Sequence, residues 1–197
     1  RAIASATLEY DIVKGLKFQT RASIDYAVKT HEQQHAAGSN ATNVSTNGRW
    51  YYQKFDDQLM YVDGIFTYNN RFGVFSLDGL LGASWQRSVY GLGVSVDNGT
   101  NALFYPNEFN FQNLPTNVQV SSTLASRAIK QGVFANIQLG FKDMIFLDLS
   151  GRNDWSSTLA GTGNESYFYP SIGLSALLNQ ILPLPEFITF SKIRASY

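Results

Sequence analysis

Residues 151–161 read GRNDWSSTLAG, and residues 166–171 read SYFYPS. The first stretch follows a run in which Ile145, Leu147 and Leu149 alternate with polar residues, and the second opens another run through aromatic residues. Alternation with period two is the pattern of a β-strand that has one apolar and one polar face. One strand therefore enters a polar loop, and the next leaves it through an aromatic belt. This arrangement is typical of a membrane-spanning β-barrel at the outer edge of a bilayer.

The same alternation recurs along the chain. It is clearest at residues 16–28, where the even positions are mostly apolar and the odd positions include Lys17, Arg21 and Asp25. It recurs at residues 75–85 and 133–139, is weaker at residues 2–10, and is ambiguous at residues 59–68 because both faces carry apolar residues. We therefore expect an all-β chain of about eight antiparallel strands in up-and-down order.

The predicted connections alternate in length. Short turns are expected at residues 13–15, 69–71 and 141–143, and long polar segments at residues 30–48, 91–125 and 155–165. Tight turns on one side and long loops on the other are the topology of an outer-membrane barrel. Residues 177–190 contain Pro183 and Pro185 and do not alternate, so they predict a longer connection on the turn side before a last strand near Lys192.

Composition agrees with a sheet that faces lipid. Charged residues make up 15% of the 197 residues and aromatic residues 14%, whereas about a quarter of a soluble domain is charged. Basic and acidic residues number 15 each, which gives no argument for a nucleic-acid partner. There is no cysteine, so disulfide scaffolds and thiol nucleophiles are excluded.

The chain lacks two other membrane signals. No apolar run reaches the roughly 18 residues of a transmembrane helix, and residues 1–5 (RAIAS) do not begin a signal peptide. Because the sequence ends at residues 194–197 inside a strand-like run, we expect a piece of a longer protein.

One short motif suggests an enzyme. His31, Glu32 and His35 form H-E-x-x-H, which on a helix would place two zinc ligands and a general base on one face. The motif follows a predicted strand directly and has no apolar stripe for helix packing. We therefore interpret it as a chance match in a polar segment, and we expect no metal site, no catalytic residues and no cofactor.

The candidate binding residues lie in the predicted loops and on the polar strand faces. Trp50, Tyr51 and Tyr105 could stack on sugar or peptide, and they could equally be interfacial or loop-packing residues. Arg152 and Asp154 belong to a polar set that would face the lumen of a barrel. For any one of these polar residues, cross-strand pairing is the more common role. Residues 167–169 are expected to cross the outer aromatic belt.

Residues 151–171 resemble the hallmark of the SusC/RagA-like TonB-dependent transporters of Bacteroidetes. The resemblance rests on the run from Arg152 to Thr158 and on the SYFYPS strand start at residues 166–171. It extends to the FKD turn at residues 141–143, to the strand IFLDLS at residues 145–150, and to FSKIRASY at residues 190–197. The close match covers residues 126–197, and residues 1–125 agree in topology only.

The resemblance implies that residues 1–197 are part of the wall of a plugged outer-membrane barrel of about 22 strands. Its outward rows would face membrane lipid. A SusD-like surface lipoprotein would cap it, TonB would energise it through a part of the protein outside these residues, and oligosaccharides or peptides would be imported. Two alternatives remain: a small outer-membrane barrel enzyme, and a soluble β-sandwich binding module.

Overall fold

The chain forms one antiparallel β-sheet, as the sequence predicts. The computed structural model describes residues 1–197 except 40–41, 43, 124–125, 184 and 186. Its strands are β1 (Ala2–Val13), β2 (Leu16–His35), β3 (Arg49–Phe72), β4 (Phe75–Asp97), β5 (Ser121–Thr123), β6 (Ser126–Phe141), β7 (Ile145–Ser156), β8 (Ser166–Leu177) and β9 (Lys192–Ser196). The short helices of the described residues are η1 (Phe111–Asn113), η2 (Ser157–Leu159) and α1 (Leu178–Ile181). None of the helices in the described part of the chain is long and apolar enough to cross a bilayer.

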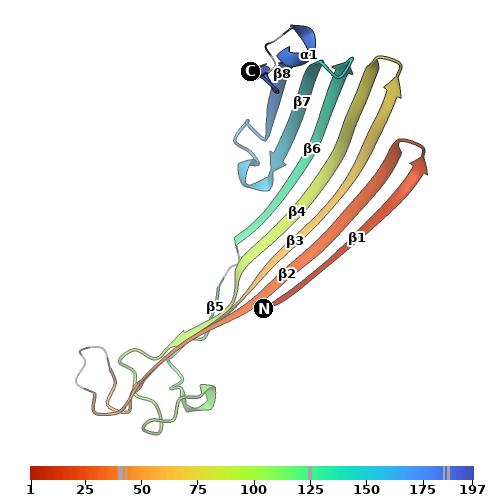
Figure 1. Ribbon diagram of the computed structural model, residues 1–197. Coiled ribbons are helices and arrows are strands. Elements are labelled where there is room, and N and C mark those ends of the chain that lie inside the picture. Colours follow the sequence, from red (N-terminus) through yellow and green to blue (C-terminus); the bar gives the residue numbers. More distant parts are fainter. Residues whose placement is uncertain (40–41, 43, 124–125, 184, 186) are drawn as a thin grey trace. The chain divides into compact units, whose positions relative to one another are not determined.

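The strands pair in an open order. The order is β1-β2-β3-β4-β6-β7-β8-β9, and β5 pairs with β4 beside this path (Figure 1). The described strands thus make a single sheet with β1 and β9 at its edges, which differs from both alternatives. A sandwich needs a second sheet to cover its apolar face, and a small barrel needs its edge strands to pair.

The chain divides into two units, which we describe separately. The wall unit comprises Ser5–Ser23, Met60–Arg87 and Ala128–Tyr197, and the loop unit comprises Arg1–Ala4, Ile24–Leu59 and Ser88–Arg127. The wall unit contains the short turns and most of the chain that alternates with period two. The loop unit contains the first two long connections.

In the wall unit, tight turns join the strands at one end (Figure 1). The turn between β6 and β7 uses Lys142 and Asp143, whose φ angles are 51° and 55°, close to the expected residues 141–143. The predicted turn at residues 69–71 is wrong. Strand β3 continues through Phe72, and the connection is at residues 73–74, because Gly73 supplies the positive φ of 61° that a two-residue hairpin favours.

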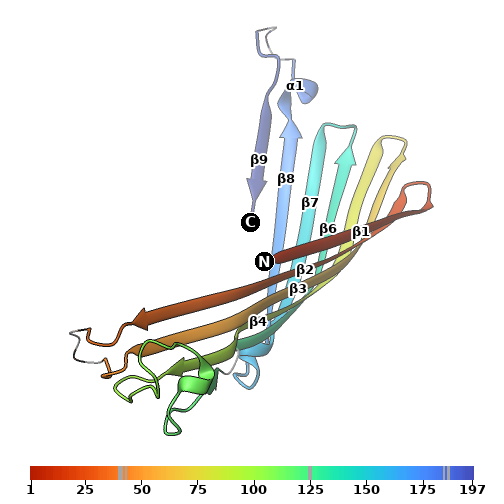
Figure 2. The same ribbon diagram turned by 90° about the horizontal axis from the view of Figure 1, so that it is seen from below.

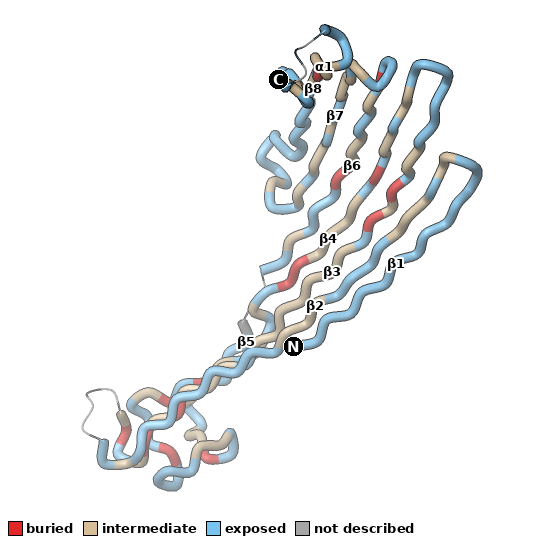
Figure 3. The backbone as a smooth tube through the Cα atoms, viewed as in Figure 1, coloured by how far each residue is buried: buried red, intermediate tan, exposed pale blue. Residues whose placement is uncertain are grey.

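The registers fix the two faces of the wall unit. Directly opposite residues in β6 and β7 include Gln138 with Asp148 and Ile137 with Leu149, so polar residues meet polar ones and apolar residues meet apolar ones. The face that carries Asp148 is the polar face, and the face that carries Leu149 is the apolar face. On the apolar face, large side chains stay exposed, among them Val133, Ile137, Leu139, Ile172 and Leu174. Figure 3 shows that buried positions on these strands are few and scattered.

The strands of the loop unit are longer than the sequence predicts. Strand β2 runs on through His35 and strand β4 through Asp97, so the loops expected at residues 30–48 and 91–125 are shorter. Gly91 looks like a strand end in the sequence, but its φ of 73° is accommodated inside β4.

The third long loop, expected at residues 155–165, belongs to the wall unit. It lies between Ser156 and Ser166 and contains η2.

The tail agrees with the prediction. Strand β8 ends at Leu177, helix α1 follows, and β9 begins at Lys192. Figure 2 shows β9 beside β8, and their register pairs Ala176 with Ile193 and Ser175 with Arg194.

Candidate functional site

A pocket of about 550 Å³ lies on the polar face of the wall unit, at the loop end of β6, β7 and β8. We call it the tyrosine pocket. It is lined by Tyr61, Ser84, Gln86, Lys130, Gln131, Arg152, Asp154, Trp155, Ser156, Thr158, Leu159, Tyr167 and Tyr169. Its size falls within the range of small-ligand sites, and it includes the two strand residues, Arg152 and Asp154, that the sequence marks as binding candidates.

Strand register brings the tyrosines to this pocket. Tyr169 lies directly opposite Arg152, and Tyr167 lies directly opposite Asp154. Directly opposite residues project from the same face of an antiparallel sheet. The prediction that residues 167–169 all cross an outer aromatic belt is therefore wrong: only Phe168, which is 64% exposed, is on the apolar face. The alternation of β8 carried this information, because Phe168 and Ile172 share a parity that the tyrosines do not.

Three neighbours fix the guanidinium of Arg152. Its Nε donates to both carboxylate oxygens of Asp154, at 2.8 and 2.9 Å. Its central carbon lies 5.3 Å from the ring centroid of Phe134, within cation–π range. Gly132 lies opposite Asp154 on β6, and a Cβ there would collide with the side chains of both Arg152 and Asp154. Because Gly132 has no side chain, the Arg152–Asp154 pair can lie against β6.

A buried carboxylate supports the pocket from β3. Asp63 is 2% exposed, accepts from Arg21 Nη2 at 2.5 Å, and accepts from the Tyr61 hydroxyl at 2.9 Å. Because a buried charge is tolerated only when it is paired and hydrogen-bonded, this arrangement holds the Tyr61 ring in place. Our sequence reasoning missed Asp63, although it is the only charged residue between residues 58 and 70.

Other polar residues of the wall unit pair across strands. Gln19 donates to Glu9 at 2.6 Å, Lys17 lies 3.4 Å from Asp11, and Gln138 donates to Asp148 at 2.6 Å. These contacts are the cross-strand pairs that the sequence analysis expects for most of the polar face.

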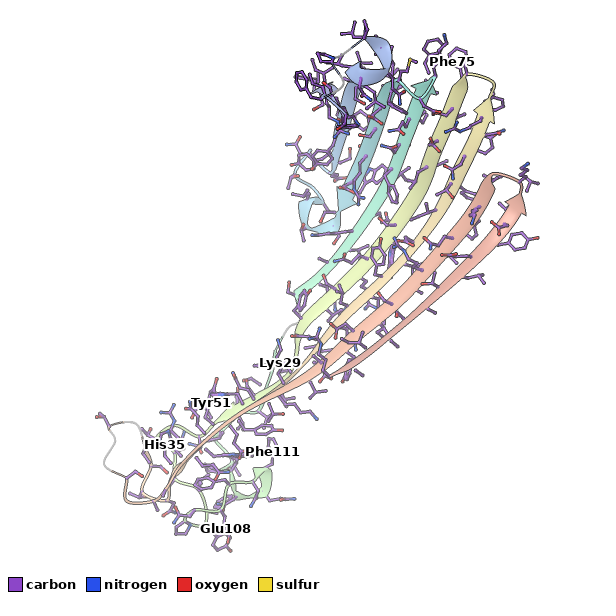
Figure 4. All side chains as sticks on the ribbon, in the orientation of Figure 1. Lys29, His35, Tyr51, Phe75, Glu108 and Phe111 are labelled. Carbon is purple, nitrogen blue, oxygen red and sulfur yellow. The ribbon has the colours of Figure 1, made fainter. Side chains whose placement is uncertain are left out.

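The loop unit holds the other predicted binding residues. Trp50 is 3% exposed, its Nε1 donates to Glu32 at 2.7 Å, and its ring lies 5.0 Å from that of Phe111. So little of this ring is exposed that it offers almost no surface for stacking on a ligand. Tyr51 packs edge-on against His31 at 5.7 Å. Tyr105 is 64% exposed, so its ring is accessible, and its binding role stays a prediction. Figure 4 labels Tyr51 and Phe111.

The H-E-x-x-H motif lies inside β2. In a strand, His31 and His35 share one face and lie roughly 13 Å apart, whereas Glu32 projects from the other face. Glu32 accepts from Gln34 and from the Trp50 indole, both at 2.7 Å, and these bonds, in that order, lower the pKa of its carboxyl. The zinc-protease geometry requires a helix, so this motif does not form it.

Comparison with known proteins gives matches in structure only. No protein-family model matches the sequence, and no curated protein matches it. The RagAB peptide transporter aligns with a TM-score of 0.74 at 15% identity, over 98% of this chain and 22% of that chain. The RagAB peptide importer aligns in its open-open state with a TM-score of 0.75 at 17% identity, over 99% and 22% of the two chains. Its closed-closed state gives 0.70 at 16% identity, over 98% and 22%.

At these identities the likeness establishes the fold. The chain has an antiparallel up-and-down sheet that matches part of the RagAB peptide transporter, and it spans about a fifth (22%) of the length of the RagAB chain that it matches. The structural match covers nearly the whole chain, so the likeness in fold includes residues 1–125, where the sequence indicates topology alone.

Proposed function

We propose that the chain is a segment of the barrel wall of an outer-membrane TonB-dependent importer of oligosaccharides or peptides. The observation that carries the proposal is the match of 98% of the chain to the RagAB peptide transporter. The sheet supports it independently, because its wall unit has an exposed apolar face, tight turns at one end and a long loop at the other.

The exposed apolar face is the physical argument for a membrane. Phe168, Leu174 and Leu81 are 64%, 53% and 55% exposed in the wall unit. In water a row of such side chains would form an apolar patch larger than soluble monomers usually carry. In an outer membrane the same row would contact lipid.

In this proposal the wall unit supplies the lumen surface and the loop unit supplies outer loops. The tyrosine pocket, with Arg152 and Asp154, and the exposed Tyr105 would contact the passing solute. A SusD-like lipoprotein would cap the barrel, and TonB would act on a part of the protein outside residues 1–197. The chain would take part in transport and carry out no catalysis.

Cells that express the full-length protein test the proposal. We expect it in the outer-membrane fraction, extracted only by detergent, and we expect uptake of labelled oligosaccharides or peptides that stops when the proton gradient is collapsed. A protein that stays soluble without detergent, or uptake of both solute classes that does not change when the gene is deleted, would contradict the proposal.

A further inference from the structure

The charge of the tyrosine pocket favours an anionic solute. Its lining residues, all within the described part of the chain, include two cations, Lys130 and Arg152, and a single carboxylate, Asp154. The carboxylate is already bonded to Arg152 Nε. One positive charge therefore remains for a ligand.

The guanidinium of Arg152 is placed to bind that ligand. Only its Nε donates to Asp154. Neither Nη atom donates a hydrogen bond to the described part of the chain. Its side chain is 46% exposed, so the Nη atoms can reach a solute. Asp154 and the Phe134 ring hold the planar group from two sides. A fixed guanidinium fork matches the two oxygens of a carboxylate, whereas a lysine ammonium acts only as a point charge.

The tyrosines provide the apolar part of the site. Tyr167 and Tyr169 lie opposite the Arg152–Asp154 pair on β8, and Tyr61 enters from β3, held by Asp63. Aromatic rings of this kind contact the hydrocarbon part of a solute and leave their polar ends to water. A cavity of about 550 Å³ has room for the end of an oligomer and its terminal charged group.

We propose that the tyrosine pocket is a carboxylate-binding subsite in which Arg152 binds the two carboxylate oxygens and Lys130 adds a second positive charge. The carboxylate is the C-terminus of a peptide or the acid group of a uronic sugar. This inference rests on the proposed function and narrows its substrate class to acidic solutes.

Two matched pairs of probes test the inference on the purified full-length transporter in detergent. One pair is a glycine–alanine pentapeptide with a free C-terminus and its C-terminal amide. The other is trigalacturonate and a neutral galactose trimer. Titration calorimetry gives each dissociation constant for the wild type, for Arg152→Gln, and for Lys17→Gln. The last variant removes a cation from the polar face outside the pocket.

We expect the acidic member of one pair to bind at least about tenfold more tightly than its neutral partner. Arg152→Gln should remove that preference and leave the affinity of the neutral member within about twofold. Lys17→Gln should keep the preference. The pair that shows it identifies the source of the carboxylate.

Other outcomes overturn the inference. Equal affinity within both pairs, or no binding by any of the four probes, would show that the pocket does not select a carboxylate. An equal loss for acidic and neutral members in Arg152→Gln would assign the arginine a role in holding the wall. If Lys17→Gln removed the preference for the acidic probe as fully as Arg152→Gln does, the preference would come from the positive potential of the whole polar face and not from the pocket. The uptake assay above decides the proposed function separately, because it does not depend on solute charge.

Discussion

The wall unit and the loop unit differ in where their large apolar side chains lie. In the wall unit, Phe168 and Leu174 are 64% and 53% exposed, while Asp63 and Ser175 are both 2% exposed. In the loop unit, Trp50, Val96 and Leu103 are 3%, 2% and 1% exposed. The wall unit therefore keeps a face of exposed apolar side chains, whereas the loop unit encloses a small core that includes large apolar side chains. In the proposed function, this is the difference expected between a wall in lipid and loops in water.

The two regions also satisfy their backbone differently. In the wall unit, the β-ladders pair the backbone from residue to residue. In the loop unit, asparagine side chains form some of the hydrogen bonds to backbone groups. Asn98, which is fully buried, accepts from the Trp50 N–H at 2.6 Å and donates to the carbonyls of Gly48 and Asn101 at 3.1 and 2.7 Å. Asn113 holds the backbone of Tyr105 and Glu108 in the same way.

Removal of the central ring of the loop unit should have the largest effect. We expect Trp50→Ala to destabilise the loops by about 3–5 kcal/mol, because it leaves a cavity between the rings of Tyr52 and Phe111. Hydrogen exchange in the full-length protein measures the loss as faster exchange at residues 98–120. Tyr105→Ala is the control, since that ring is 64% exposed. Unchanged protection in Trp50→Ala would show that the core of the loop unit is not its source of order.

A charge introduced on the apolar face of the wall unit tests whether that face contacts lipid. We expect Leu149→Arg to destabilise the barrel in lipid by about 2–4 kcal/mol, because the charged guanidinium would lie in hydrocarbon. Ser150→Arg, one residue further along β7 and on the polar face, should be nearly neutral. Urea unfolding in lipid vesicles measures both. If the two variants unfold alike, the faces are not exposed to different media.

Loss of a buried amide should have a smaller effect. Asn98→Ala removes three hydrogen bonds to the backbone, and we expect a loss of about 1–3 kcal/mol from the unsatisfied groups that remain. Limited proteolysis should then cut within residues 98–120 while the strands stay intact. Asn117→Ala, which removes one exposed bond to Asn101, serves as the matched control and should not increase cleavage.

Acid should weaken the loop unit slightly. The hydrogen bond from Arg49 lowers the pKa of the Asp97 carboxyl, and the Gly99 N–H lowers it further. Because this pKa is lower in the folded state, the contribution is fully present above the unfolded value of roughly 3.9 and is lost as pH falls through the folded pKa. We expect proteolysis at residues 98–120 to increase below about pH 4, and we expect Asp97→Asn to reduce that pH dependence. A pH response that Asp97→Asn leaves intact would assign it to another group.

The sequence predicted the sheet well because alternation is a local property. Leu147 and Leu149 against Asp148 specify two faces wherever the strand lies, and Pro183 and Pro185 argue against a central strand through residues 177–190 without reference to its neighbours. Turns were less certain. Residues 69–71 contain two asparagines and resemble a turn, yet the strand pairing carries them into β3 and places the turn at Gly73.

The candidate site was only partly predictable. Arg152 and Asp154 belong to a polar row that the sequence displays, so their face was evident. Tyr61 and Asp63 come from β3, about ninety residues earlier, and Gly132 comes from β6. Only the pairing of strands that are distant in sequence brings these residues together, and no local pattern encodes that pairing.

By itself, the sequence determined that the chain is a set of two-faced strands with turns on one side and loops on the other, because period-two alternation depends only on consecutive residues. The tertiary structure decided which residues of different strands meet. It placed Tyr169 opposite Arg152 and Tyr167 opposite Asp154, and it buried Trp50 against Phe111. The physical reason is register: a shift of one residue between neighbouring strands exchanges their faces, and only the assembled sheet fixes that shift.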